Sequence, residues 1–292
     1  MRTVALLTPT HAKDIERFDL LCESMDRYVT GYERHYVIVN DDDLPLFQKY
    51  ASARRVIAPS SAYLPSWLWS TPRFLAFNGR RIWISPLCKP VHSWHVQQLL
   101  KISGALQAAE DRICIVDSDN LFFREFDVRA YAGGEKTPLY VNRAAISAKE
   151  PKHTVWTRNA FRLLGLPDPL FPADDYVGNV IAWDKEALIS LTDEISLATG
   201  LNWRLALCRQ RQFSEYLLYG QFIAHAPRFR EQHAIVEKSL VCAYWDERQL
   251  DEAWVREMLR GAEPQMVALC IQSYSHTSAP VIRSAMRLAR AA

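Results

Sequence analysis

Two carboxylates separated by one residue stand directly after a short apolar run. Residues 113–116 are uncharged and predict a buried strand, and Asp117 and Asp119 follow it. In extended backbone, side chains two positions apart project to the same side, so these carboxylates can converge on one ligand. A hard divalent cation such as Mg²⁺ or Mn²⁺ prefers oxygen ligands of this kind. The alternative interpretation of residues 117–120 is a polar turn, because all of their types favour turns.

Two further side chains could contact a nucleotide. Asp41 begins an acidic run that follows a predicted strand at 35–39, and it could hydrogen-bond a base or a ribose. A solvated turn is the alternative interpretation of that run. Lys101 lies on the predicted helix that leads into the Asp117 strand and could reach a phosphate, although a helical lysine most often faces solvent.

The elements that must position these residues alternate between strand and helix. Residues 3–7 and 35–39 predict strands, and apolar residues at helical spacing from Ile15 to Tyr28 predict a helix between them. Such an order, with polar loops after the strands, opens a nucleotide-binding α/β sheet. Further strands are predicted at 139–142, 180–183 and 266–271. Helices are predicted at 91–109, 155–164, 213–220 and 250–259, and two more begin at about 185 and at 280. Gly220 is expected to end its helix.

Composition places the chain among ordinary globular proteins. Its 292 residues are 49% hydrophobic and 23% charged, with a net charge of +2. The sequence has no basic patch with interleaved aromatics, so we expect no nucleic-acid partner. Six scattered cysteines without a C-x-x-C pair indicate a reduced, cytoplasmic protein. No apolar stretch approaches the roughly 20 residues that span a bilayer, so we expect a soluble protein without a transmembrane segment.

The order of these parts resembles a GT-A glycosyltransferase, and it is especially similar to bacterial glycosyltransferase-like proteins of uncharacterised specificity. The resemblance rests on the strand–helix–strand opening, the apolar strand that closes on D-x-D at 117–119, the polar loop and strand at 174–183, Glu215 and the late His276. It implies an α/β fold whose mixed, mostly parallel nucleotide-binding sheet is flanked by helices. One domain would cover 1–292, with a nucleotide-sugar-binding half at 1–123 and an acceptor-binding half at 124–292.

The resemblance also implies roles for the donor side of the site. In that family the D-x-D carboxylates hold a divalent cation, Mn²⁺ or Mg²⁺, that bridges the diphosphate of a nucleotide sugar. Asp119 would be the direct ligand, and Asp117 would contact the ribose or the cation. His276 would complete the metal site, with a surface histidine as the alternative. Thr8 and Thr10 fall where the family contacts the nucleoside.

A carboxylate on the acceptor side would take the proton of the acceptor hydroxyl in an inverting enzyme. Glu215 lies about where the resemblance implies this base, and Asp174 and Asp175 compete with it for the role or bind acceptor hydroxyls instead. The loop at 178–179, just before a predicted strand, is similar to that of retaining members, so the stereochemistry stays open.

The function implied is a metal-dependent transfer of sugar from a nucleotide sugar, with a UDP-sugar favoured, to a carbohydrate or glycolipid acceptor. In a bacterium the reaction would serve surface polysaccharide or glycolipid synthesis. The protein would lie in the cytoplasm, where it could contact the inner face of the membrane peripherally. A haloacid-dehalogenase-type phosphatase with Asp117 as nucleophile is one alternative, although Asn120 departs from its motif. A non-catalytic nucleotide-sugar-binding protein is the other.

Overall fold

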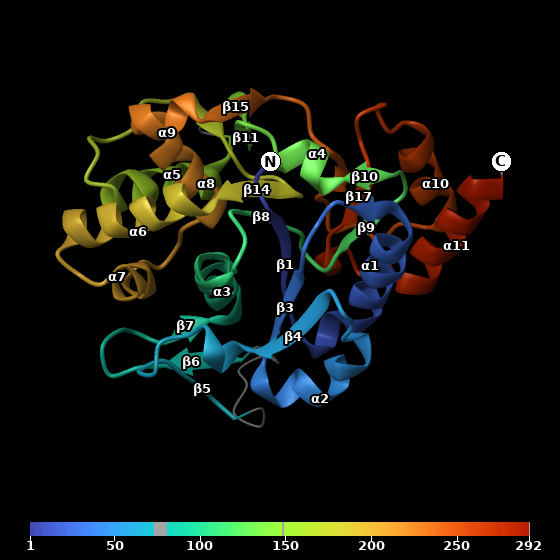
Figure 1. Ribbon diagram of the computed structural model, residues 1–292, viewed down its shortest axis with the longest axis horizontal. Coiled ribbons are helices and arrows are strands. Elements are labelled where there is room, and N and C mark those ends of the chain that lie inside the picture. The colour runs from blue at the N-terminus through green and yellow to red at the C-terminus, as the bar shows by residue number, and fades with distance from the viewer. Residues whose placement is uncertain (73–80, 148, 292) are drawn as a thin grey trace.

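A five-stranded sheet runs through the centre of the computed structural model, which describes residues 1–72, 81–147 and 149–291 (Figure 1). Its strands, in spatial order, are β14 (Ile181–Asp184), β8 (Arg112–Ile115), β1 (Val4–Thr10), β3 (His35–Val39) and β4 (Arg55–Pro59). Only β14 is antiparallel to its neighbour, and the other pairs are parallel. The chain is therefore a mixed α/β protein with a mostly parallel central sheet.

Both faces of this sheet are covered, because alternate residues of each strand enter different apolar clusters. Leu7, Ile113 and Ile115 pack with the helices α3 (Ser93–Gln107), α6 (Lys185–Thr199) and α8 (Glu215–His225). Leu6 and Cys114 pack on the opposite face with α1 (Ile15–Tyr28). Figure 1 shows α3, α6 and α8 on one side of the sheet and α1 on the other.

The helix α3 lies unusually close to the sheet. A Cβ atom at its Gly104 would stand 2.7 Å from Cδ1 of Ile38 and 3.0 Å from Cδ1 of Leu7. Only glycine allows this approach without displacing the strand residues. The close packing fixes the height of α3 over the sheet, and with it the position of Lys101.

A second sheet continues the chain just beyond the two carboxylates. It has the order β16 (Val241–Tyr244), β17 (Ala268–Ile271) and β9 (Asn120–Phe122). The helices α10 (Glu252–Arg260) and α11 (Ala279–Ala291) pack beside it, and α11 also contacts α1. Residues 116–119 therefore form the crossing from the central sheet to the second sheet.

The remaining elements are short or lie around these two sheets. The helices are α2 (Leu44–Phe47), α4 (Val128–Ala132), α5 (Pro151–Leu163), α7 (Trp203–Arg209) and α9 (Pro227–Glu231). The strands are β2 (Val29–Thr30), β5 (Trp69–Ser70), β6 (Ile82–Ile84), β7 (Val91–His92), β10 (Phe126–Asp127), β11 (Thr137–Tyr140), β12 (Asn142–Ile146), β13 (Ala173–Asp175) and β15 (His233–Val236). None of the described helices is both long enough and apolar enough to cross a membrane.

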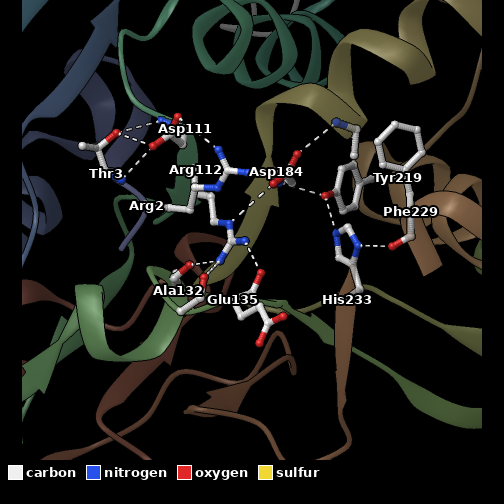
Figure 2. A network of polar contacts seen from close by, with 12 residues as sticks. Arg2, Thr3, Asp111, Arg112, Ala132, Glu135, Asp184, Tyr219, Phe229 and His233 are labelled. Atoms are coloured by element: carbon white, nitrogen blue, oxygen red, sulfur yellow. Dashed lines mark hydrogen bonds and ion pairs between the residues drawn. The ribbon is translucent and has the colours of Figure 1, made fainter. Parts of the chain in front are cut away.

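A buried polar network anchors the start of β8 to its surroundings (Figure 2). The guanidinium of Arg112 pairs with Asp184 of β14 and donates to three backbone carbonyls, those of Ala132, Gly134 and Glu135. The backbone N–H of Asp184 donates to the hydroxyl of Tyr219, and His233 Nε2 lies 2.9 Å from the same hydroxyl. These contacts hold β8 in place, and Asp117 follows the carboxyl end of this strand.

Several element boundaries differ from the sequence prediction, and two of these differences concern the surroundings of the site. The first strand extends to Thr10, so Thr8 and Thr10 lie within β1 and not after it. The helix α8 continues through Gly220 to His225, because Gly220 is needed for packing and not for termination. A Cβ there would lie 2.0 Å from the ring of Tyr176. Glycine thus marks a close contact in the middle of this helix.

Candidate active site

Asp117 and Asp119 lie in the turn that joins β8 to β9, at the carboxyl end of β8. This is the edge where open α/β sheets bind their ligands. Asn120 holds the turn, because its backbone N–H and its side-chain amide both donate to the carbonyl of Asp117, at 3.1 and 2.9 Å. The predicted buried strand at 113–116 is confirmed, and the two carboxylates follow it as expected.

Lys101 binds directly to the first of these carboxylates. Its Nζ lies 2.9 Å from Oδ1 and 3.0 Å from Oδ2 of Asp117, and it also donates to Glu215 Oε1 at 2.8 Å and to the Tyr216 hydroxyl at 3.0 Å. Burial alone would lower the pKa of Lys101, but Asp117 and Glu215 outweigh it and hold the pKa well above the usual value. The lysine is therefore a buried cation beside the two-carboxylate turn and not a solvent-facing residue.

The carboxyl of Asp119 has a different environment. Burial, with a further contribution from the negative charge of Asp117, raises the pKa of Asp119 to about 7. The guanidinium of Arg17 and a hydrogen bond from the Cys270 thiol act in the opposite direction. Within the described part of the chain, Oδ1 of Asp119 is buried and accepts no hydrogen bond. A bound cation is one kind of partner that would satisfy such an atom.

The side chains present fit an open cation site and not an enclosed one. Among the described residues, no three histidine, cysteine, aspartate or glutamate side chains gather closely enough to hold a metal. Mg²⁺ is nevertheless often bound by one or two carboxylates together with water and substrate phosphates. Asp119 has an unpartnered oxygen for such a cation, whereas both oxygens of Asp117 contact Lys101.

His276 is not brought into a group with the two carboxylates. It is exposed and ends a short helical turn, Ser273–Ser275, with a φ of 56°. Arg17 fixes the segment around it, because it donates to the carbonyls of Ile271 and Thr277 at 2.5 and 2.8 Å. The geometry therefore supports Arg17 as a neighbour of the site more directly than it supports His276 as a ligand. No sequence pattern distinguished Arg17 from other surface arginines.

The two threonines of β1 differ in what their hydroxyls do. The hydroxyl of Thr8 donates to the carbonyl of Val116 at 2.6 Å and lies 2.9 Å from Nε2 of the buried His35. It therefore supports the end of β8 from inside the sheet. In the described structure, the buried hydroxyl of Thr10 has no hydrogen-bond partner. Of the two, Thr10 keeps a group that could contact a nucleoside.

Asp41 serves the turn after β3. Its Oδ1 accepts hydrogen bonds from the Ser60 hydroxyl and the Ser61 backbone N–H, both at 3.0 Å. These bonds tie the end of β3 to the end of the neighbouring β4. This arrangement favours the turn interpretation over a role in base recognition, although the side chain is exposed at the same edge of the sheet.

Glu215 begins α8 and is only 4% exposed. Its carboxylate is paired with Lys101, and its backbone N–H donates to Gln98 Oε1 at 3.1 Å. A proton acceptor must reach the substrate hydroxyl it serves. Burial and pairing instead make Glu215 a positioning group for Lys101, so its placement does not support the predicted role as base.

Asp174 and Asp175 lie on β13 and have separate partners. Asp174 accepts a hydrogen bond from the Ala144 backbone N–H at 2.9 Å and pairs with Arg143 at 2.7 Å, which ties β13 to the antiparallel β12. Asp175 lies 2.7 Å from Nδ1 of His153. The sequence prediction missed His153, because the predicted helix began at 155; α5 begins at Pro151 and places His153 three residues before Trp156 on one helix face.

Comparison with protein families gives a match along nearly the whole chain. A family model described as "Family of unknown function (DUF6492)" matches residues 1–288. The matched region includes both carboxylates of the turn, Lys101 and the His153–Asp175 pair. No curated protein matches the chain.

Proposed function

We propose that this chain, which belongs to the DUF6492 family, is a metal-dependent glycosyltransferase with a GT-A-type fold. Its donor would be a nucleotide sugar, with a UDP-sugar favoured, and its acceptor a carbohydrate or glycolipid. The observation that carries the proposal is the pair of carboxylates, Asp117 and Asp119, at the carboxyl end of β8 beside the buried cation of Lys101. The mostly parallel sheet and its covering helices support the same proposal.

The charges around this turn suit a diphosphate leaving group. Cleavage of the sugar–phosphate bond leaves negative charge on the diphosphate, and a divalent cation held by Asp117 and Asp119 would stabilise that charge as a Lewis acid. Lys101 fixes the orientation of the Asp117 carboxylate through contacts to both of its oxygens. Arg17 adds a second positive charge near Asp119.

Calorimetric titration of UDP and GDP, each with Mn²⁺ and with EDTA, tests this proposal. We expect one nucleotide to bind only with the metal, and we expect Asp119→Asn to weaken that binding by about tenfold or more. Asp193→Asn is the control, because Asp193 is an exposed aspartate of α6. If neither nucleotide binds under any condition, the proposal is wrong. A test for an aspartyl-phosphate at Asp117 would then follow.

A further inference from the structure

A histidine–aspartate pair lies outside the Asp117–Asp119 turn, between α5 and β13. Nδ1 of His153 is 2.7 Å from Oδ2 of Asp175, and the two side chains are 27% and 13% exposed. The other oxygen, Oδ1 of Asp175, accepts a hydrogen bond from the Val177 backbone N–H at 2.9 Å. Both oxygens of Asp175 are thus engaged. The carboxylate is fixed, and it fixes the histidine ring in turn.

This arrangement determines which ring nitrogen of His153 is basic. An ionised carboxylate can only accept hydrogen bonds, so in the neutral ring Nδ1 carries the proton and donates it to Asp175. The lone pair then resides on Nε2. Within the described residues, no hydrogen bond reaches Nε2. The pair therefore presents an oriented, partly exposed base.

Two tryptophans extend the ring of His153 into an aromatic stack. The ring of His153 lies 4.8 Å from that of Trp156, and Trp156 stacks on Trp94 of α3 with ring centroids 5.2 Å apart and an interplanar angle of 24°. Trp94 is 46% exposed. A flat apolar ring with a polar group beside it suits a ligand that has an apolar face and hydroxyl groups, as a sugar ring does.

The stack and the carboxylate turn are connected through two helices. Trp94 and Lys101 are seven residues apart on α3, which places them on the same face about 10 Å apart along the axis. Tyr176, the neighbour of Asp175, packs on Gly220 of α8, one helical turn beyond Tyr216, whose hydroxyl contacts Lys101. The helix α3 thus carries both Trp94 and Lys101, and α8 contacts both Lys101 and the residue that follows Asp175.

We propose that His153 is the catalytic base of the glycosyl transfer, that Asp175 is its positioning residue, and that Trp94 and Trp156 bind the sugar ring of a carbohydrate acceptor. This inference rests on the proposed function. An acceptor hydroxyl gives its proton to Nε2 of His153 as its oxygen forms a bond to the anomeric carbon of the donor. The bond from that carbon to the diphosphate breaks, and the diphosphate leaves with the electron pair. The imidazolium then returns its proton to water.

The tautomer of His153 can be measured without any substrate. Long-range ¹H–¹⁵N NMR spectra at pH 7.5 should show His153 protonated at Nδ1, with the signals assigned by comparison with His153→Gln. His225→Gln provides the matched control, because Nδ1 of His225 also contacts an oxygen, the carbonyl of Gln221. A neutral His153 protonated at Nε2 would overturn the proposal, since that atom could not then accept a proton.

Kinetics distinguish this inference from the proposed function. Release of UDP from UDP-glucose is measured with water and with a panel of methyl hexosides as acceptors, for the wild type, His153→Gln, Asp175→Asn and His225→Gln. We expect kcat to fall about 100-fold or more in His153→Gln, with the affinity for UDP and Mn²⁺ unchanged. Added imidazole should restore part of the rate to His153→Ala. If the wild type binds no nucleotide, the proposed function fails; if His153→Gln binds UDP and releases it at the wild-type rate, only this inference fails.

The aromatic stack has its own readout. Trp94→Ala should raise KM for the best methyl hexoside and leave UDP binding unchanged, because the stack would contact only the acceptor. Trp245→Ala replaces a similarly exposed tryptophan, 51% exposed, that follows β16 in the second sheet, and it should leave KM unchanged. An unchanged KM in Trp94→Ala would remove the stack from the acceptor site.

Discussion

At the scale of single residues, the site depends on a lysine that is buried among negative charges. Among the described residues, the carboxylates of Asp117 and Glu215 share one contact, the ammonium group of Lys101. Its side chain is 6% exposed, so neither it nor Glu215 can exchange its partner for water. A buried ion pair adds little net stability by itself, but removal of one partner leaves an uncompensated charge.

Lys101→Met should destabilise the fold by about 3–5 kcal/mol, because it leaves buried carboxylate charge without its partner. Glu215→Gln should cost less, because Lys101 keeps its contact with Asp117. Urea unfolding at pH 7.5 measures both effects, and Lys152→Met, at an exposed position of α5, should stay within about 0.5 kcal/mol of the wild type. If Lys101→Met were as stable as Lys152→Met, the buried charge cluster would not contribute to the stability of the fold.

The same residues show what sequence could and could not reveal about the site. The spacing of Asp117 and Asp119 after an apolar run is local, so the buried strand and the turn that carries both carboxylates could be predicted. Lys101 could be seen only as a helical lysine, since its partner Glu215 is 114 residues away in sequence. The role expected for Glu215 depended on its order in the chain, and only the fold reveals that its carboxylate faces inward.

At the scale of elements, α8 combines two packing requirements. Its first turn presents Glu215 and Tyr216 to Lys101, and the next turn carries Gly220 beneath the ring of Tyr176. Tyr176 directly follows Asp175. The close contact at Gly220 thus sets the distance between α8 and β13, the strand that carries Asp175 of the His153–Asp175 pair.

Gly220→Ala should therefore destabilise the protein by about 1–3 kcal/mol, although alanine normally favours a helix over glycine by about 1 kcal/mol. The added Cβ would lie 2.0 Å from Cγ of Tyr176, which cannot be accommodated without moving the ring. Chemical denaturation gives the cost, and Gly134→Ala is the control, because nothing lies within 4 Å of a Cβ there. A stabilised Gly220→Ala would show that the tyrosine has room to move.

Periodicity predicted the longer helices and four of the five strands of the central sheet, because apolar alternation and helical spacing are set by which face of an element is buried. The helix from Ile15 to Tyr28 is confirmed at both ends. Glycine was the main source of error, since the same residue type ends helices and permits close packing, and only the ring of Tyr176 decides between the two at Gly220. The His153–Asp175 pair joins a helix to a strand, which no local pattern encodes.

At the scale of the whole molecule, two kinds of buried titratable group change stability with pH in opposite directions. Burial lowers the pKa of His95 to about 4, and it also lowers the pKa values of His35 and His233. Burial raises the pKa of Asp119 to about 7. The histidines hold the central sheet and its covering helices together in their neutral form, whereas Asp119 belongs to the proposed cation site.

These shifts predict opposite dependences of stability on pH. Between pH 6.5 and about 4 the unfolded chain binds a proton at His95 and the folded protein does not, so acidification should reduce stability, on the order of 2 kcal/mol by pH 5 from His95 alone. Between about pH 4 and 7 the folded protein keeps a proton on Asp119 that the unfolded chain releases, so stability from this group falls as pH rises. Metal-free Asp119→Asn should accordingly be more stable than the wild type at pH 8 and lose this advantage by pH 5.

Urea unfolding of the wild type, Asp119→Asn and His95→Gln at pH 8, 6.5 and 5, in EDTA, separates the two contributions. Asp119→Asn removes the group that gains stability in acid, so its midpoint should fall more steeply than that of the wild type between pH 8 and 5. His95→Gln removes one of the groups that lose stability, so its midpoint should fall less steeply. Parallel curves for all three proteins would mean that neither group changes its protonation on unfolding. Mn²⁺ should reverse the order at pH 8, because a cation that binds the ionised Asp119 stabilises only the wild-type carboxylate.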